Sequence, residues 1–476
     1  MTSAPQIIAF DQWDERYIEL KEQGLSEPWY GGPLRRHAVD GGDMRLPRLK
    51  YDNSAASLRL WNFLLTEEER LHQARSAGRK IVGTMKDLGT VPVMAFSHPN
   101  ITAFYPDGAW WTPCIMESSD GLLAIADSLG IDESFCPVRA MLGAFVSRKE
   151  TVSPGGADVE VQVEAHFPIP DLLVCSVGAT CDDFAAIARR LNGLGHPILW
   201  WEVPHRRHTD ENEDAVELPG GFRAPSSQVD FVRDEFERLR EALSSLGGSP
   251  LDDCMISSGI RTANRARRLL AELRRLAYTA SVCPLPALEM QIAEMLIIHF
   301  CSDREETIHV YEELLREVAT RVNAGIGVLP SDAVRVYWVN PVADLRAMNI
   351  LEDCGGRVCG TEYLFCHALD QIPENIPPME ALARSALADP MVGSSSDRAQ
   401  RICRDIRDFG AEAVVISRIP GASHCALEGT IIGENIRCEL GIPVLEIEVP
   451  PLSDSIRASL TTRLEAMIET VKEHRR

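Results

Sequence analysis

The stretch PDLLVCSVGATCDDFAAIARRLNGLGHPILWWEV, residues 170–203, decides the fold of this chain. Its two apolar runs, Asp171–Gly178 and Pro197–Val203, are bounded by Gly or Pro, as is typical of buried strands. Between them, the apolar residues of CDDFAAIARRL recur at helical spacing, and Gly193 stands near the end of that segment. The stretch therefore predicts a strand–helix–strand unit whose two strands are parallel.

The same alternation extends on both sides of this unit. Further apolar runs predict strands at Lys80–Met85, Val334–Val339, Arg357–Thr361, Ala413–Ile419 and Pro443–Val449. Helical stretches such as DRAQRICRDIRDFGAE separate the later strands, and the section between the two strand sets is helical. We therefore expect an α/β fold of two doubly wound, Rossmann-like domains with parallel sheets, joined by a helical section. The expected parts are a partly irregular N-terminal lead-in (1–75), a first α/β domain (76–225), a helical section (226–330) and a second α/β domain (331–476).

Composition excludes several classes of function. With 70 acidic and 48 basic residues, the formal net charge of −22 argues against a nucleic-acid partner, because such binding needs Lys and Arg to neutralise phosphates. We see no secretory signal, and no apolar run approaches the roughly 20 residues of a membrane-spanning helix, so we expect a soluble, cytoplasmic protein. Thiols stay reduced in that compartment. The 13 cysteines are therefore expected to be core residues or metal ligands rather than disulfides.

Three cysteines share one local context. Cys181 follows the strand DLLVCSVG and opens a helix, Cys425 follows the strand AVVISRI by a Gly-containing loop, and Cys136 precedes Pro137 and VRAMLGAF. Helix starts favour thiolates, and parallel sheets bind ligands outside the carboxyl ends of their strands. Thiolates from two such domains could hold one iron–sulfur cluster in the cleft between them, with one iron open to substrate. The alternative, that each is a small buried hydrophobic residue, stays open, because the spacing matches no compact metal motif.

The other cysteines are weaker candidates. Cys175 lies in the middle of a predicted strand and Cys114 precedes a predicted helix; both are reserve ligands for a larger cluster. A set with zinc-like spacing consists of Cys354, Cys359, Cys366 and His367. Core packing is favoured for this set, because its first two members lie at a helix end and within a strand. The cysteines expected to be structural are Cys254, Cys283, Cys301, Cys403 and Cys438.

The segments around the three cysteines carry a family resemblance. They are SSDGLLAIADSLGIDESFCPVRAMLGAF, PDLLVCSVGATCDDFAAIARRL with HPILWWEVPH, and DFGAEAVVISRIPGASHCALEG with LGIPVLEIEVPPLSDSIRASLTTRLEAMIE. In order, and from about Ala77 to Glu473, they resemble the 2-hydroxyacyl-CoA dehydratase and benzoyl-CoA reductase superfamily. Carried over by position, the resemblance implies that Cys136, Cys181 and Cys425 bind a [4Fe–4S] cluster between two α/β domains.

The resemblance also implies partners and an activity. It implies an acyl-CoA substrate, a homologous second subunit or a self-dimer, and an ATP-hydrolysing iron–sulfur activator that supplies a low-potential electron. Because the lead-in and the segment WYGGPL are similar to the larger benzoyl-CoA reductase-type subunit, the leading expectation is the iron–sulfur subunit of an ATP-driven benzoyl-CoA reductase-like enzyme. The alternatives are a 2-hydroxyacyl-CoA dehydratase subunit acting through a ketyl radical, a non-catalytic electron-relay partner, and a double-cubane reductase. The chain has no GxxxxGK[ST] motif, so ATP dependence must come from a partner, and the lack of GxGxxG weakens a nicotinamide hypothesis.

Several polar residues are candidates for supporting roles. His424, beside Cys425, is the candidate catalytic residue, as a donor to the cluster or to an intermediate; a surface histidine is the alternative. The basic run His205–His208 ends a predicted strand and could meet CoA phosphates, or it could be a solvated loop. Lys86–Asp87 follows the first strand, and Glu428 is expected to cap the helix after Cys425.

Overall fold

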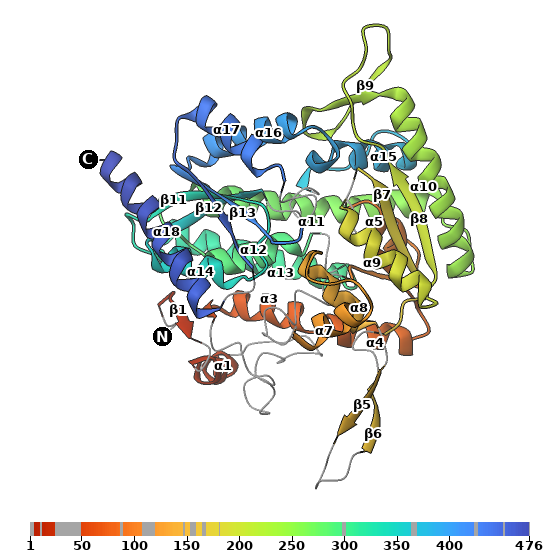
Figure 1. Ribbon diagram of the computed structural model, residues 1–476, viewed down its shortest axis with the longest axis horizontal. Helices are drawn as coiled ribbons and strands as arrows, with labels where there is room; N and C mark the ends of the chain where they lie inside the picture. Colours follow the sequence, from red (N-terminus) through yellow and green to blue (C-terminus); the bar gives the residue numbers. More distant parts are fainter. Residues whose placement is uncertain are drawn as a thin grey trace.

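Two parallel four-stranded sheets form the framework of the structure, a computed structural model (Figure 1). It describes residues 4–9, 12–23, 49–85, 89–106, 120–145, 148–152, 159–163, 168–179, 181–297, 301–362, 369–422, 427–450 and 453–475. The first sheet contains, in spatial order, β4 (Ile101–Phe104), β3 (Lys80–Met85), β7 (Leu172–Gly178) and β8 (Ile198–Val203). The second contains β12 (Gly356–Glu362), β11 (Val334–Val339), β13 (Ala413–Arg418) and β14 (Val444–Glu448). The expected α/β fold with two parallel, Rossmann-like sheets is confirmed.

Both sheets have the same strand order. Counted along the chain, each runs second, first, third, fourth, so the direction of winding reverses between β3 and β7 and between β11 and β13. Seven of these eight strands coincide with apolar runs that the sequence predicts. The exception is β4, because its four residues, ITAF, are too short to show a pattern.

Helices cover both faces of the first sheet. They are α4 (Glu67–Ser76) and α9 (Asp182–Gly193) on one face and α5 (Val91–Ser97) and α10 (Ser226–Gly247) on the other. Alternation along the strands directs Ile81 and Leu173 to the α4/α9 face and Val82 and Val174 to the α5/α10 face. Burial on both faces explains why these strands are continuously apolar.

The second sheet is covered in the same way. Its helices are α14 (Arg346–Asp353) and α18 (Asp454–His474) on one face and α16 (Ser395–Phe409) and α17 (Gly429–Leu440) on the other. Val336 and Val415 point to the first face, and Tyr337 and Val414 to the second. Each sheet is therefore doubly wound, and its open edge for ligands is the one formed by the carboxyl ends of the strands.

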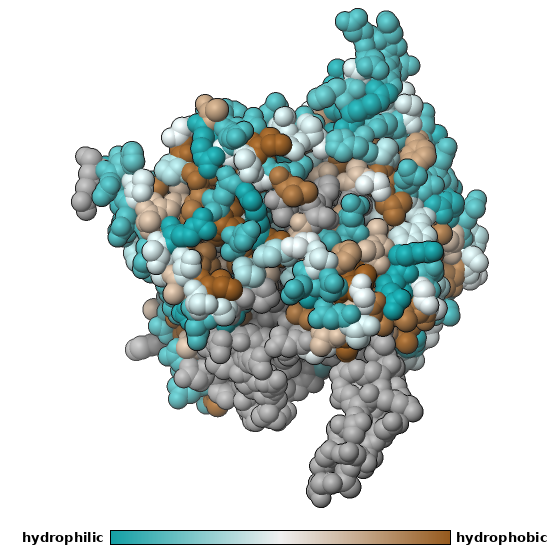
Figure 2. All heavy atoms as spheres, viewed as in Figure 1, coloured by the Kyte–Doolittle hydropathy of each residue, from teal (hydrophilic) through white to brown (hydrophobic). Residues whose placement is uncertain are grey.

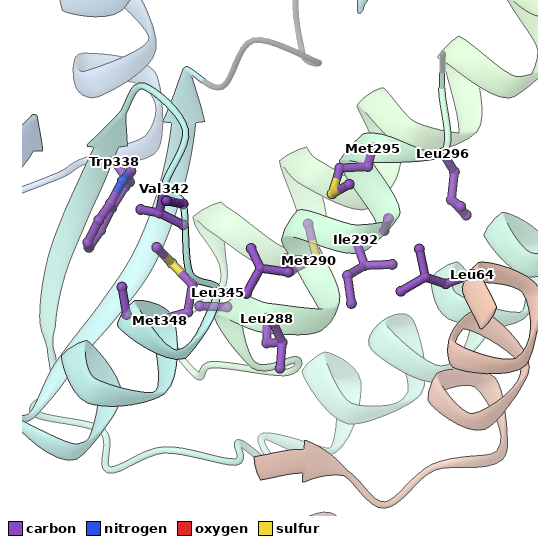
Figure 3. Packing of buried hydrophobic residues seen from close by; sticks show 14 of the residues in the cluster. Leu64, Leu288, Met290, Ile292, Met295, Leu296, Trp338, Val342, Leu345 and Met348 are labelled. Atoms are coloured by element: carbon purple, nitrogen blue, oxygen red, sulfur yellow. The ribbon is translucent and has the colours of Figure 1, made fainter. Parts of the chain in front are cut away.

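A helical layer connects the two halves. It contains α3 (Ala55–Leu65), α11 (Asp253–Thr279), α12 (Ala287–Met295), α13 (Arg304–Ala324) and α15 (Pro378–Ala388). Helix α11 packs on α5 beside the first sheet and on β12 of the second. Every residue of α12 is buried, and Figure 3 shows its Met290 and Ile292 lying between Leu64 of α3 and Met348 of α14. One hydrophobic cluster thus runs from the first sheet through α12 to the second.

The remaining elements lie around this framework. They are β1 (Ile7–Ala9), α1 (Trp13–Glu22), β2 (Lys50–Asp52), α7 (Asp120–Ser128), α8 (Met141–Ala144), β5 (Arg148–Val152), β6 (Val159–Val163), β9 (Ala215–Glu217) and β10 (Arg223–Pro225). The β5–β6 and β9–β10 pairs are antiparallel. The β5–β6 pair extends away from the body of the molecule (Figure 1), whereas the β9–β10 pair packs on α10. None of the helices in the described ranges has both the length and the apolar character that crossing a membrane requires.

Two carboxyl groups are buried in the helical layer. Glu289 of α12 accepts hydrogen bonds from the backbone N of Asp52 (2.9 Å) and from Nε1 of Trp61 (3.1 Å), while its Oε2 has no partner. Burial raises the pKa of Glu289 to about 8. Burial likewise raises the pKa of Glu352, which accepts from the backbone N of Ala287 (2.7 Å), to about 7. Both carboxyl groups therefore hold a proton in the folded protein at a pH where the unfolded chain releases it.

This difference makes stability depend on pH. The pKa of Glu289 is about 8 in the folded protein and 4.5 ordinarily. The contribution of its proton to the free energy of unfolding is therefore fully present below pH 4.5 and is lost as the pH rises to about 8. We expect Glu289→Gln to be more stable than the unsubstituted protein at pH 8 by a few kcal/mol, at about 1.4 kcal/mol per pKa unit, and to lose that advantage near pH 5. Denaturant unfolding at a series of pH values measures the difference. The exposed Glu272→Gln is the control, and an equal pH slope in Glu289→Gln and the unsubstituted protein would contradict the assignment.

Candidate functional site

Cys181 lies just beyond the carboxyl end of β7. The strand ends at Gly178, whose φ is +103° and where a Cβ atom would stand 2.2 Å from the carbonyl oxygen of Val203. Only glycine permits this close turn, which directs the chain toward α9. Cys181 is the N-cap residue of α9, and its half-buried Sγ donates a hydrogen bond to Oδ2 of Asp183 at 3.4 Å. The thiol thus lies just past the carboxyl end of a strand and at the start of a helix, as the sequence predicts, and β7 borders the winding reversal of the first sheet.

Cys136 lies close to the same helix. It is 8% exposed and precedes a short 3-10 helix, Pro137–Ala140, that packs on α9 and on α7. Cys136 belongs to the large hydrophobic cluster, and Cys181 packs against that cluster from its edge. The first two cysteine segments, separated in sequence by the β5–β6 hairpin, are therefore neighbours in the fold.

The loop after β13 reaches this place from the second sheet. Gly421 has a φ of +81°, and a Cβ atom there would stand 2.7 Å from the carbonyl oxygen of Phe135, the residue before Cys136. The absence of a side chain allows the two loops to touch. Cys425 and His424 follow in sequence but lie outside the described residues. The segment that leads to the third cysteine is thus in contact with the segment that leads to the first.

Cys181 and Cys425 follow equivalent strands of the two sheets along the chain. Each follows the third strand of its sheet, and in both sheets that strand borders the point where the winding reverses. This edge is where open α/β sheets place their ligands. Among the residues that the structure describes, no group of three or more His, Cys, Asp or Glu side chains could hold a metal ion; of the three predicted ligands, only Cys136 and Cys181 fall within those residues.

Most other cysteines pack in the core. Burial raises the pKa of the Cys175 thiol far above its ordinary value, and raises those of Cys283 and Cys359 to about 12. Burial also raises the pKa values of the Cys354 and Cys403 thiols to about 11. Such buried thiols are typical of core residues. Cys301 is buried as well, whereas Cys254 and Cys438, expected to be structural, are exposed on α11 and α17. Cys114, Cys366 and His367 lie outside the described residues, as do Lys86 and Asp87.

The basic run His205–His208 does not form one surface. Arg206 is buried, donates to the carbonyl oxygens of Leu387 (2.6 Å) and Asp389 (3.2 Å), and lies 4.1 Å above the ring of Phe222. Its guanidinium therefore fastens the segment after β8 to the C-terminal end of α15. Arg207 pairs with Glu213 at the surface. Both guanidinium groups thus have partners within the protein, and the hypothesis that this run meets CoA phosphates stays a prediction.

Glu428 does not cap α17 as the sequence suggests. It stands at the N-cap position but its side chain makes no capping hydrogen bond. Instead its carboxylate accepts from Nη1 of Arg398 at 2.6 Å and from Oγ of Ser395 at 2.8 Å. Leaving a buried guanidinium without a carboxylate partner costs more free energy than leaving a helix end without a side-chain cap. Glu428 therefore pairs with Arg398 and does not cap α17.

Sequence reasoning missed the group around Arg398. Its guanidinium contacts Glu362, the last residue of β12, and Asn340, which follows β11. Asn340 has a φ of +70°, a conformation that asparagine tolerates better than most residues. The pair Asn-Pro directly after the apolar run VRVYWV was the available signal, but no local pattern indicates a partner so far along the chain.

Comparison with protein families matches residues 94–471 to "2-hydroxyglutaryl-CoA dehydratase, D-component". A comparison with curated proteins found no match. The matched range includes all three predicted ligands, Cys136, Cys181 and Cys425, and every strand of the two sheets except β3. It confirms the superfamily that the sequence resembles and indicates an enzyme of the dehydratase type. The chain belongs to the 2-hydroxyglutaryl-CoA dehydratase D-component family, within the 2-hydroxyacyl-CoA dehydratase superfamily.

Proposed function

We propose that the chain is the cluster-bearing subunit of an enzyme that dehydrates a 2-hydroxyacyl-CoA thioester, with one [4Fe–4S] cluster bound by Cys136, Cys181 and Cys425. The observation that supports this most strongly is the contact between Gly421 and Phe135, because it joins the loops that lead to two of these cysteines. The third, Cys181, begins the helix on which the segment after Cys136 packs.

The donor set and its surroundings fit such a cluster. Thiolates are its usual ligands, and three of them leave one iron open to a substrate oxygen and able to pass single electrons. The chain itself excludes water, because Cys136 is buried in the same apolar cluster as Ala422. The Cys181 thiol donates to Oδ2 of Asp183 at 3.4 Å, a hydrogen bond that would be lost if the sulfur bound the cluster as a thiolate. His424, next to Cys425 in sequence, is the proposed proton donor.

We further propose that the phosphates of the CoA substrate bind in a surface cavity of about 700 Å³ between the β9–β10 hairpin and α16. It is lined by Arg223, Arg404, His208 and Gln400 among others. Within the described part of the chain Arg404 makes no ion pair, so its charge is available to a ligand. The lining also includes Arg206 and the carboxylates of Asp397 and Glu439. The segment between β8 and β9, which contributes His208, is hydrophilic (Figure 2).

We expect Arg404→Ala to raise the KM for the CoA thioester about tenfold, as loss of one charge-assisted hydrogen bond would, and to leave kcat nearly unchanged. Steady-state kinetics with the complete enzyme measures both constants. The control is Arg233→Ala on α10, because Arg233 pairs with Asp230 and neither residue lines the cavity. Equal effects of the two substitutions, or none, would place the phosphates elsewhere.

The benzoyl-CoA reductase-like reaction remains the second candidate. It is supported by the lead-in and the segment WYGGPL, residues 29–34, which lie outside the described residues. The family match supports dehydration. A double-cubane reductase would need further thiolates, and the reserve ligand Cys175 is fully buried within β7, where its Sγ donates to the carbonyl oxygen of Ser176 at 3.5 Å.

Turnover by the assembled enzyme tests the proposed function. The chain, loaded with iron and sulfide, is combined with a homologous second subunit, or tested as a self-dimer, and with an ATP-hydrolysing iron–sulfur activator. We expect loss of water from a 2-hydroxyacyl-CoA to give the 2,3-unsaturated thioester, with the activating electron recovered after each turnover. Reduction of benzoyl-CoA instead would establish the second candidate. An iron-loaded chain inactive toward both substrates would indicate an electron-relay partner.

A further inference from the structure

Arg398 of α16 holds together the carboxyl edge of the second sheet. Its Nε and Nη2 donate to the two carboxylate oxygens of Glu362 at 2.8 and 2.6 Å, and Nη2 also donates to Oδ1 of Asn340 at 2.5 Å. Its Nη1 donates to Oε2 of Glu428 at 2.6 Å, and Oγ of Ser395 donates to the other oxygen at 2.8 Å. These contacts lock the start of α17 to the ends of β11 and β12.

In the described part of the chain, two carboxylates share the guanidinium of Arg398. The side chain of Arg398 is only 1% exposed. Glu362 takes both ends of the guanidinium fork, which is the strongest geometry for such a pair. The carboxylate of Glu428 is 20% exposed, so solvent screens its charge only in part.

We propose that the fixed negative charge of Glu428 lowers the reduction potential of the cluster, and that Arg398 is the positioning residue that holds it there. This inference rests on the proposed function, because Glu428 follows the proposed ligand Cys425 by three residues. Adding an electron makes a cluster more negative, and a nearby fixed negative charge opposes that change. A low potential is what single-electron transfer to a thioester requires.

The experiment compares the iron-loaded chain with its Glu428→Gln variant. Each is titrated anaerobically with titanium(III) citrate, a one-electron reductant, while the reduced cluster is followed by electron paramagnetic resonance and iron is counted. We expect unchanged iron and a reduction about tenfold more favourable in Glu428→Gln, a positive shift of about 59 mV for one electron. Glutamine keeps an oxygen for Arg398, so we expect the fold to persist.

Two further variants make the result specific. Glu428→Asp keeps the charge and should restore most of the original potential. Glu434→Gln removes the same charge from an exposed position of the same helix and should leave the potential unchanged. An unchanged potential in Glu428→Gln, or an equal shift in Glu434→Gln, would overturn the inference. Absence of iron from the unsubstituted chain would instead overturn the proposed function, so the two failures are distinguishable.

Discussion

Serine at Cys136, Cys181 or Cys425 is expected to remove most of the iron from the chain and to lower turnover by more than about 100-fold. Loss of a residue that only supports a metal ligand costs about 10–100-fold in metal affinity or activity, and loss of the ligand itself costs more. A hydroxyl is a poor replacement for a thiolate on iron. Iron analysis of each variant after anaerobic purification and circular dichroism of its fold separate cluster loss from unfolding.

The matched controls are cysteines away from this place. Cys403 is buried in α16 and Cys254 is exposed on α11. Serine at either position should leave the iron content unchanged, with a modest loss of stability only for the buried one. Full iron in all three ligand variants would show that the thiols are core residues, the alternative that their spacing alone leaves open.

The largest effect on stability is expected at Arg321. This buried side chain donates to both carboxylate oxygens of Asp52, at 2.6 and 3.2 Å, and to the carbonyl oxygen of Pro284 at 2.8 Å. Arg321→Met leaves the charge of Asp52 in the interior without its partner, which costs about 3–5 kcal/mol. Denaturant unfolding should show a correspondingly lower midpoint.

An exposed pair provides the comparison. Arg407 and Glu439 are joined across α16 and α17 with half of the Arg407 side chain in solvent. Such pairs contribute about 0–1 kcal/mol, so Arg407→Met should change the unfolding free energy little. The double variant Asp52→Asn with Arg321→Met should recover part of the loss, because no charge is then left buried. Equal losses from the buried and exposed substitutions would mean that the buried pair has no special role.

Much of the fold is predictable because buried parallel strands have a local signature. The run Asp171–Gly178 predicts β7 to within one residue, since both ends are marked by a breaker or a charge. Placing Cys181 beyond its end follows from the same marks. The strand β4 has no such signature, because four buried residues can belong to a strand or a helix.

Long-range polar contacts are the part that sequence patterns do not show. Arg398 is 58 residues from Asn340, 36 from Glu362 and 30 from Glu428 along the chain. Only the topology of the sheet brings these residues into contact. Local spacing suggests a helix cap at Glu428, which is wrong because its carboxylate pairs with the buried guanidinium of Arg398 and makes no capping hydrogen bond. The contact of Gly421 with Phe135 joins the two halves in the same way.

The most direct test of the proposed cluster is the iron and sulfide content of the chain purified without oxygen. One cubane on the proposed ligands Cys136, Cys181 and Cys425 predicts about four irons and four sulfides per chain. About eight irons would indicate the double-cubane alternative and contradict a single site. A folded chain with no iron, even after reconstitution with iron and sulfide, would contradict the proposed function.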